Sequence, residues 1–139
     1  MTISLDIRSG LQKRARSVGG LPAEVAVEGV FFSPTVGTPF VSFKLQPTSE
    51  QPASVGPAGM TRVDGLFLID LCYPNKMGTG DAEEMADLVK SAFRSDPEIT
   101  EGNARVRVLY AQRGPVLLEP DWIRVPVTVR FYAFILTVD

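Results

Sequence analysis

Apolar and polar positions recur along this chain with two different periods, and each period predicts one kind of element. Over residues 2–18 the apolar residues recur at steps of three and four, which is typical of an amphipathic helix, and the glycine pair at 19–20 ends it. The same spacing predicts a second helix over residues 81–94. We expect Asp81 to be its N-cap, with Glu84 three residues later completing a box-like arrangement.

Period-two alternation predicts the strands. Strands are expected in residues 23–34, 39–47, 61–74, 104–113 and 122–138. Residues 61–74 are apolar on both faces, so this strand should be central in its sheet. The end of the last strand is also apolar on both faces, so the first helix or a neighbouring subunit should cover it. The predicted fold class is α+β, with a mostly antiparallel sheet flanked by two main helices, as a single domain over residues 1–139.

Residues 46–59 are rich in proline and glycine and lack any periodicity. Such a stretch inside a compact domain predicts a long exposed loop, and loops of this length are usually functional or mobile. We interpret it as a loop that contacts a partner and becomes ordered there. Its candidate contact residues are Gln46, Thr48, Glu50, Gln51 and Val55.

Four arginines fall on alternate positions of the last two long strands. If Val106 and Val108 pair inward with Val127 and Val125 in an antiparallel register, the arginines gather on the opposite face. They are Arg105, Arg107, Arg124 and Arg130. One interpretation is an ordinary solvated sheet face, since alternating Val and Arg is typical of one-sided sheets. The other is a local basic contact surface on a mildly acidic protein.

Composition excludes several functions. A chain of 139 residues has the length of one domain, and a net charge of −2 provides no large field to attract nucleic acid or a membrane. With no histidine and only Cys72, zinc pairs, disulfides and the Ser-His-Asp and Cys-His arrangements are absent. Cys72 is predicted to be a core residue. The chain contains neither an apolar run near twenty residues nor a leader-like segment, so we expect a soluble, cytoplasmic protein.

The remaining candidates for chemistry fail on spacing. Gly78 and Gly80 precede the second helix, but Glu83 stands where a dinucleotide fingerprint needs glycine, and no Gly-Lys-Ser/Thr follows. Asp64 and Asp70 share a strand face, yet six residues separate their backbones by roughly 20 Å, too far for a carboxylate pair. We predict no active site, cofactor or metal, and so no enzyme.

Several short motifs occur in an order that carries a resemblance. These are an acid and an aromatic before proline on the first strand, a Gly-Phe pair in the central strand, a Pro-Gly turn before an "A…A…F" helix, and aromatic residues in the last strand. They are Glu28 with Phe31 or Phe32 and Pro34, then Gly65 and Phe67, then Pro74, Gly78, Gly80, Ala82, Ala86 and Phe93, and finally Trp122 and Tyr132. Over most of its length the chain resembles the phage tail terminator-like family. It departs from that pattern in the longer turn "PNKMGTG" and in Gly29, where the family often has asparagine.

The resemblance implies a structural virion protein that assembles as a homohexameric ring. The ring caps the tail tube of a long-tailed phage or prophage, stops tube polymerisation and offers its other face to the head-side connector protein. Assembly in the host bacterial cytoplasm and a place at the head–tail junction are implied, without catalysis, cofactor or membrane. The arginine face is then expected to line a lumen for passing DNA or to pair with acids of the next subunit. Another connector or tail-completion protein and a non-viral oligomeric binding domain are the alternatives.

Overall fold

The alternating segments of the sequence form one sheet of seven strands, and two helices pack on it. The computed structural model describes residues 3–27, 32–35, 37–52, 60–75, 78–102 and 104–136. The helices are α1 (Ile3–Arg16) and α2 (Gly80–Ser95). The strands are β1 (Glu24–Val27), β2 (Phe40–Pro52), β3 (Met60–Pro74), β4 (Glu98–Glu101), β5 (Ala104–Arg113), β6 (Leu117–Leu118) and β7 (Trp122–Leu136).

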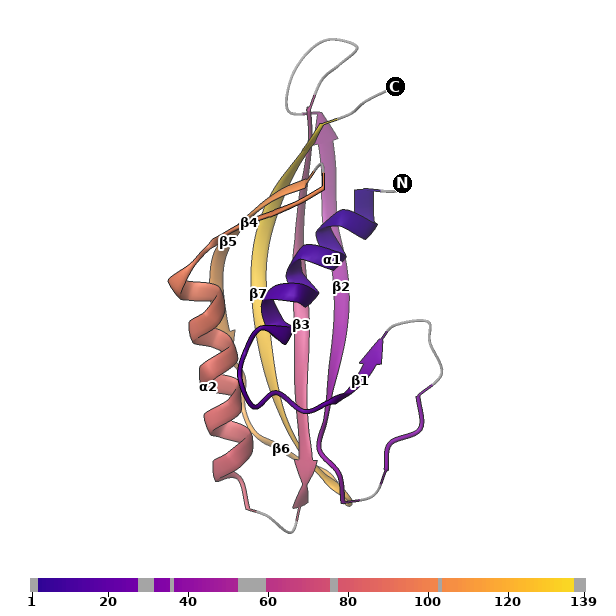
Figure 1. Cartoon of the computed structure of the whole chain (residues 1–139), viewed down its shortest axis with the longest axis vertical. Coiled ribbons are helices and arrows are strands. Elements are labelled where there is room, and N and C mark those ends of the chain that lie inside the picture. Colours follow the sequence, from indigo (N-terminus) through magenta and orange to yellow (C-terminus); the bar gives the residue numbers. More distant parts are fainter. Residues whose placement is uncertain are drawn as a thin grey trace.

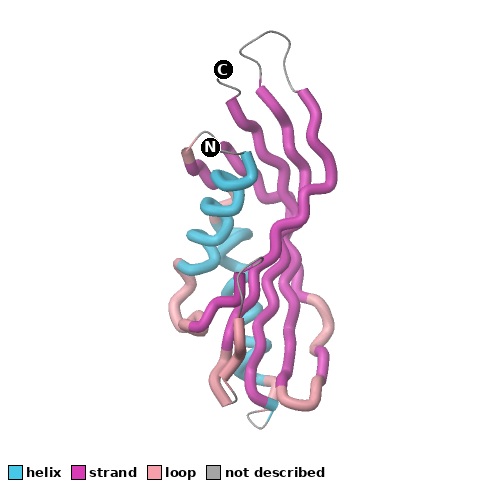
Figure 2. Tube along the Cα trace, turned by 90° about the vertical axis from the view of Figure 1, so that its right-hand side faces the viewer, coloured by secondary structure: helices cyan, strands magenta, loops and turns pink. Residues whose placement is uncertain are grey.

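The strands are ordered β1-β2-β3-β7-β5-β4, with β6 paired to β7 (Figure 1). The β1–β2 pair is parallel and the other pairs are antiparallel. The sheet is therefore mixed, which modifies the prediction of a mostly antiparallel one. Both helices lie on the same side of the sheet (Figure 2). The α+β class and the central position of β3 are confirmed.

The hydrophobic core lies between the sheet and the two helices. Phe67 of β3 is at its centre with no exposed surface, 5.5 Å from the ring of Phe43 and 6.3 Å from that of Phe93. Phe43 comes from β2 and Phe93 from α2, so these three rings join the sheet to the helix. On β7 the core side is Val125, Val127, Val129, Phe131, Ala133 and Ile135, all buried.

The second helix begins slightly before its predicted start. Its N-cap is Thr79, which makes no side-chain capping hydrogen bond, and the Glu83 N–H donates to the Thr79 carbonyl at 3.0 Å. Asp81 as N-cap was therefore a wrong prediction. The reason is Gly78, whose φ of 75° reverses the chain so that Thr79 is already in helical conformation. Asp81 instead lies in the first turn, where its carboxylate still interacts favourably with the helix dipole.

Residues 46–52 are not a loop, which corrects the prediction for 46–59. They continue β2 and pair with β3, with Gln46 opposite Leu66 and Glu50 opposite Val63. The register shifts between Pro47 and Ser49, so Thr48 lies in a bulge, and Gln51 pairs with Arg62. Beyond Phe43 this strand has no β1 alongside it, and prolines are tolerated on such an edge because their missing N–H breaks no ladder bond.

The resulting β2–β3 hairpin extends past the N-terminal end of α1 (Figure 1). Val55 lies outside the described residues, as do Glu28 and Phe31.

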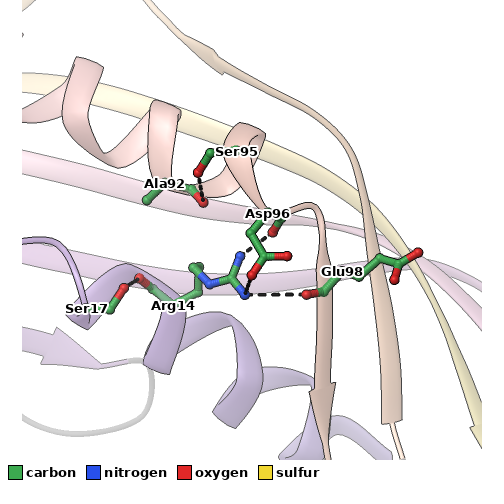
Figure 3. Close-up of polar contacts among 6 residues, drawn as sticks. All are labelled: Arg14, Ser17, Ala92, Ser95, Asp96 and Glu98. Carbon is green, nitrogen blue, oxygen red and sulfur yellow. Dashed lines mark hydrogen bonds and ion pairs between the residues drawn. The ribbon is translucent and has the colours of Figure 1, made fainter.

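Arg14 links the end of α1 to the segment that connects α2 and β4 (Figure 3). Its guanidinium donates to the Asp96 carbonyl, to the Asp96 carboxylate at 3.1 Å and to the Glu98 carbonyl at 3.4 Å. Only 19% of the Arg14 side chain is exposed. A single side chain thus satisfies two backbone carbonyls and one carboxylate where two elements meet.

Replacing Arg14 with alanine is expected to lower the free energy of unfolding by about 1–2 kcal/mol, because several hydrogen bonds from a mostly covered charged group are lost together. The matched control is Lys13→Ala. Lys13 also forms an ion pair, with Glu101 at 2.6 Å, but its side chain is 69% exposed, so the loss should stay below about 0.5 kcal/mol. Urea denaturation of both variants measures the difference, and equal losses would contradict the role given to Arg14.

Candidate assembly surface

The face of the sheet away from the helices is uncovered over most of its length. It consists of the even-numbered positions 62–70 of β3 and 124–134 of β7, together with Lys44 of β2 and Arg105, Arg107 and Tyr110 of β5. We call it the open face (Figure 2). Leu66, Leu68, Tyr132 and Phe134 are only half-buried there, unlike their fully buried neighbours on the core side. An exposed sheet face of this composition is typical of an interaction surface.

The four predicted arginines do lie on the open face, but at different places along it. Val106 pairs with Ala133 and Val108 with Phe131, so the predicted β5–β7 register was wrong by six residues. A shift by an even number keeps each side chain on its face. It places Arg107 opposite Tyr132. Tyr132 lies eight residues along β7 from Arg124, so Arg107 and Arg124 are roughly 26 Å apart along the sheet.

Two of these arginines are paired within the chain. Arg107 binds Glu98 at 2.8 Å, while Arg124 binds Asp70 and Glu119, each at 3.0 Å. In the described part of the chain, Arg105 and Arg130 are exposed and have no ion pair. Lys44 of β2, which lies opposite Leu68, is also exposed and has no ion pair among the described residues, so the free positive charge of the face is carried by Arg105, Arg130 and Lys44.

An aromatic strip missed by sequence analysis crosses the end of the open face. The Arg62 guanidinium lies 4.4 Å from the ring centroid of Tyr132 and binds Asp64 at 3.0 Å. Tyr132 contacts Phe134 edge to face, with 5.5 Å between ring centroids. A shallow hollow of about 220 Å³ lies beside these rings, lined in part by Arg105 and Thr100. The alternating pattern indicated which side chains face outward, but only the register shows which of them meet.

The two edges of the sheet are poorly suited to pairing with another strand. On β2, β1 covers only residues 40–43, and the remaining edge carries Pro47 and a bulge. The opposite edge, β4, is four residues long and has Glu98 and Glu101 at its ends. Proline, bulges, charges and short strands are the features by which proteins prevent edge-to-edge association. Contacts through faces are thereby favoured over contacts through edges.

The candidates for chemistry lie apart from one another. Asp64 and Asp70 are on one face as predicted, but each binds a different arginine, Arg62 and Arg124. Within the described residues, no group of three or more His, Cys, Asp or Glu side chains is placed to hold a metal ion. None of the helices described is both long and apolar enough to cross a membrane.

Cys72 is fully buried, as predicted for a core residue. Burial raises the pKa of its thiol from 9.0 to about 11, although Arg124 acts in the opposite direction.

Because only the unfolded thiol ionises between pH 9 and 11, the stability that Cys72 contributes is complete below pH 9 and is lost as pH rises to 11. We expect the native thiol to react with an aromatic disulfide reagent at pH 8 at least about 100-fold more slowly than the unfolded one. Urea denaturation at pH 8 and at pH 11 gives the fall in the free energy of unfolding over this range. This fall should be smaller for Cys72→Ala than for the parent protein. Rapid native labelling would contradict this placement.

The fold and the open face together define a class, an α+β protein whose single sheet has both helices on one side and an open face on the other. A family model for phage tail terminator protein matches residues 6–131. The chain therefore belongs to the phage tail terminator family, a structural and non-enzymatic one, and a structural role in the phage tail and a place in the virion follow.

Two solved structures share the fold. One, of a protein without a descriptive name, has a TM-score of 0.70 and 22% identity, with 100% of both chains covered. The other belongs to the virion of a native gene transfer agent particle, with a TM-score of 0.59, 20% identity and 98% of both chains covered. No curated protein matches the sequence significantly.

Proposed function

We propose that this protein forms a homohexameric ring that caps the tail tube, stops its polymerisation and provides the head–tail joining interface. The observation that carries the proposal is the family match over residues 6–131. The uncovered sheet face supports it, because a monomer has no need of half-buried leucines and aromatic rings on an exposed surface. The protein is assembled in the host bacterial cytoplasm and resides at the head–tail junction.

The partners in this proposal are further copies of the chain, the tail tube protein and the head-side connector protein. The projecting β2–β3 hairpin, with Gln46, Thr48 and Glu50 on β2, is the proposed contact with the tube or with a neighbouring subunit (Figure 1). Hydrogen exchange tests this contact. Backbone amides of residues 46–52 should be more protected in assemblies than in free protein, and equal protection in both states would remove the hairpin from the interface.

Light scattering over a concentration series, checked by negative-stain images, tests the ring. A mass of about six subunits, or a monomer that becomes a ring on meeting tail tubes, is the expected result, since closed cyclic assembly is what caps a tube. A strict monomer that never associates with tubes would overturn the proposal.

DNA passes through the opening of the proposed ring without sequence specificity. Arg105→Glu together with Arg107→Glu separates the possible roles of the arginine face. Intact rings with impaired DNA passage would place these residues in the lumen, since contacts to passing DNA are mainly electrostatic. Loss of rings would place them between subunits. Intact rings with normal DNA passage would exclude both roles.

A further inference from the structure

Arg130 is an exposed cation near the middle of the open face. Within β7 it stands between Leu66 of β3 and Tyr110 of β5, both opposite it in the strand registers. Tyr110 is 40% exposed and Leu66 is half-buried. Arg130 is exposed and has no ion pair in the described part of the chain, so its charge is free to bind an acid on another molecule.

A complementary surface lies on the other side of the protein, along α2. A hollow of about 250 Å³ is lined by Tyr73, Asp81, Glu84, Met85 and Leu88. Leu88 is 45% exposed, although it continues the apolar pattern of the helix. Asp81 and Glu84 are exposed and, within the described residues, have no ion pair. By contrast, the nearby acids Glu83 and Asp87 both contact Arg113, at 3.7 Å.

The shape and chemistry of this acidic hollow fit an arginine side chain. Two carboxylates on its rim, which have no ion pair among the residues that the structure describes, can accept charge-assisted hydrogen bonds from a guanidinium. The apolar side chains of Met85 and Leu88 can pack against the aliphatic stem of the same arginine. Burial and the charge of Asp81 both raise the pKa of Tyr73, as expected where an acid faces this hollow.

We propose that the acidic hollow at Asp81 and Glu84 of one subunit receives Arg130 from the open face of the next subunit. The inference rests on the proposed ring and names the contact that closes it. Arg130 alternates with Val129 and Phe131, which are buried on the core side, so it lies on the face away from α2. Both helices pack on the other side of the sheet (Figure 2), so each subunit presents one surface to each of two neighbours. Such a heterologous contact repeats from subunit to subunit and forms a ring when the rotation closes.

The other candidate contacts on the chain are less suitable. Both sheet edges carry proline, a bulge or charges, which hinder pairing with a strand of another molecule. Arg107 and Arg124 are already neutralised by Glu98 and by Asp70 with Glu119.

Charge reversal on each side tests the pair. Arg130→Glu alone and Glu84→Arg alone each place like charges at every contact, and the concentration needed for assembly should rise at least about tenfold. An equimolar mixture of the two variants makes every contact opposite in charge again when they alternate, so rings with an even number of subunits should reappear. Native mass spectrometry of the mixture should show equal numbers of the two chains.

Two controls keep the test decisive. Arg16→Glu reverses an exposed arginine in the last turn of α1, which lines neither the acidic hollow nor the surroundings of Arg130, and it should leave assembly unchanged. Circular dichroism must show that each variant is folded, and if a reversal unfolds the chain, Arg130→Gln and Glu84→Gln replace it, each expected to weaken assembly.

The possible results distinguish failure of the Arg130 contact from failure of the proposed ring. Wild-type rings together with undisturbed rings in both reversed variants would overturn the contact and leave the ring in place. Loss of assembly in each variant without recovery in the mixture would also overturn it, because the two residues would then not face each other. A wild-type protein that is monomeric at every concentration and absent from tube ends would overturn the ring, and this contact with it.

Discussion

Replacing Phe67 with alanine is expected to lower the free energy of unfolding by about 3–5 kcal/mol. Phe67 has no exposed surface and touches the rings of Phe43 and Phe93, which come from β2 and α2. Its removal leaves a cavity at the point where the sheet and the helix meet, and the surrounding backbone can relax only partly. The loss is a large fraction of the stability of an ordinary domain.

Phe134→Ala is the matched control for this change. Phe134 is on the open face and only half-buried in the isolated subunit, so its removal should cost less than half as much in the monomer. Urea denaturation followed by circular dichroism measures both. Similar losses for the two variants would mean that the open face is as well covered as the core, contrary to the structure described above.

Gly65→Val is expected to lower the free energy of unfolding by about 2–3 kcal/mol through overpacking. A Cβ atom at Gly65 would lie 2.9 Å from the Gln46 carbonyl oxygen, 3.1 Å from the Pro47 Cα and 3.1 Å from the Phe131 ring. Two of these atoms belong to the backbone of the strand opposite, so the hairpin itself must shift. Gly65 pairs directly with Pro47, where the register of β2 shifts, so an added side chain there meets the backbone of the neighbouring strand.

Gly19→Ala provides the comparison, because an added Cβ at Gly19 meets no atom within 4 Å. It should leave stability unchanged or raise it by a few tenths of a kcal/mol, as loss of glycine restricts the unfolded chain. Thermal unfolding of the two variants tests the contrast. A Gly65→Val protein as stable as its parent would show that the hairpin near Pro47 is more open than described.

Sequence pattern predicted the elements best where one face is buried. The start of α2 was missed by one residue because the positive φ of Gly78 sets it, and a sequence pattern does not show that geometry. The central position of β3 was predicted because its residues are apolar on both faces. Ile99 is buried in β4, yet a strand of four residues between charged positions gives too short a pattern to recognise.

The sequence predicted which face of the sheet carries the arginines, but not where along that face each of them lies. Alternation determines which side of the sheet Arg105 and Arg130 occupy, and both are on the predicted side. Position along the sheet depends on register, and a run of similar apolar residues on β7 fits several registers that differ by an even number. The length of β2 was missed for another reason, since proline usually indicates a loop and is tolerated only on an edge.

The most direct test of the account follows the tail tube itself. Purified tube protein polymerises in the presence or absence of this chain, and electron microscopy records tube lengths and tube ends. We predict a ring at one end of each capped tube and no further growth from that end after more tube protein is added. Tubes that keep growing at both ends, with the chain absent from every end, would contradict its role as the terminator.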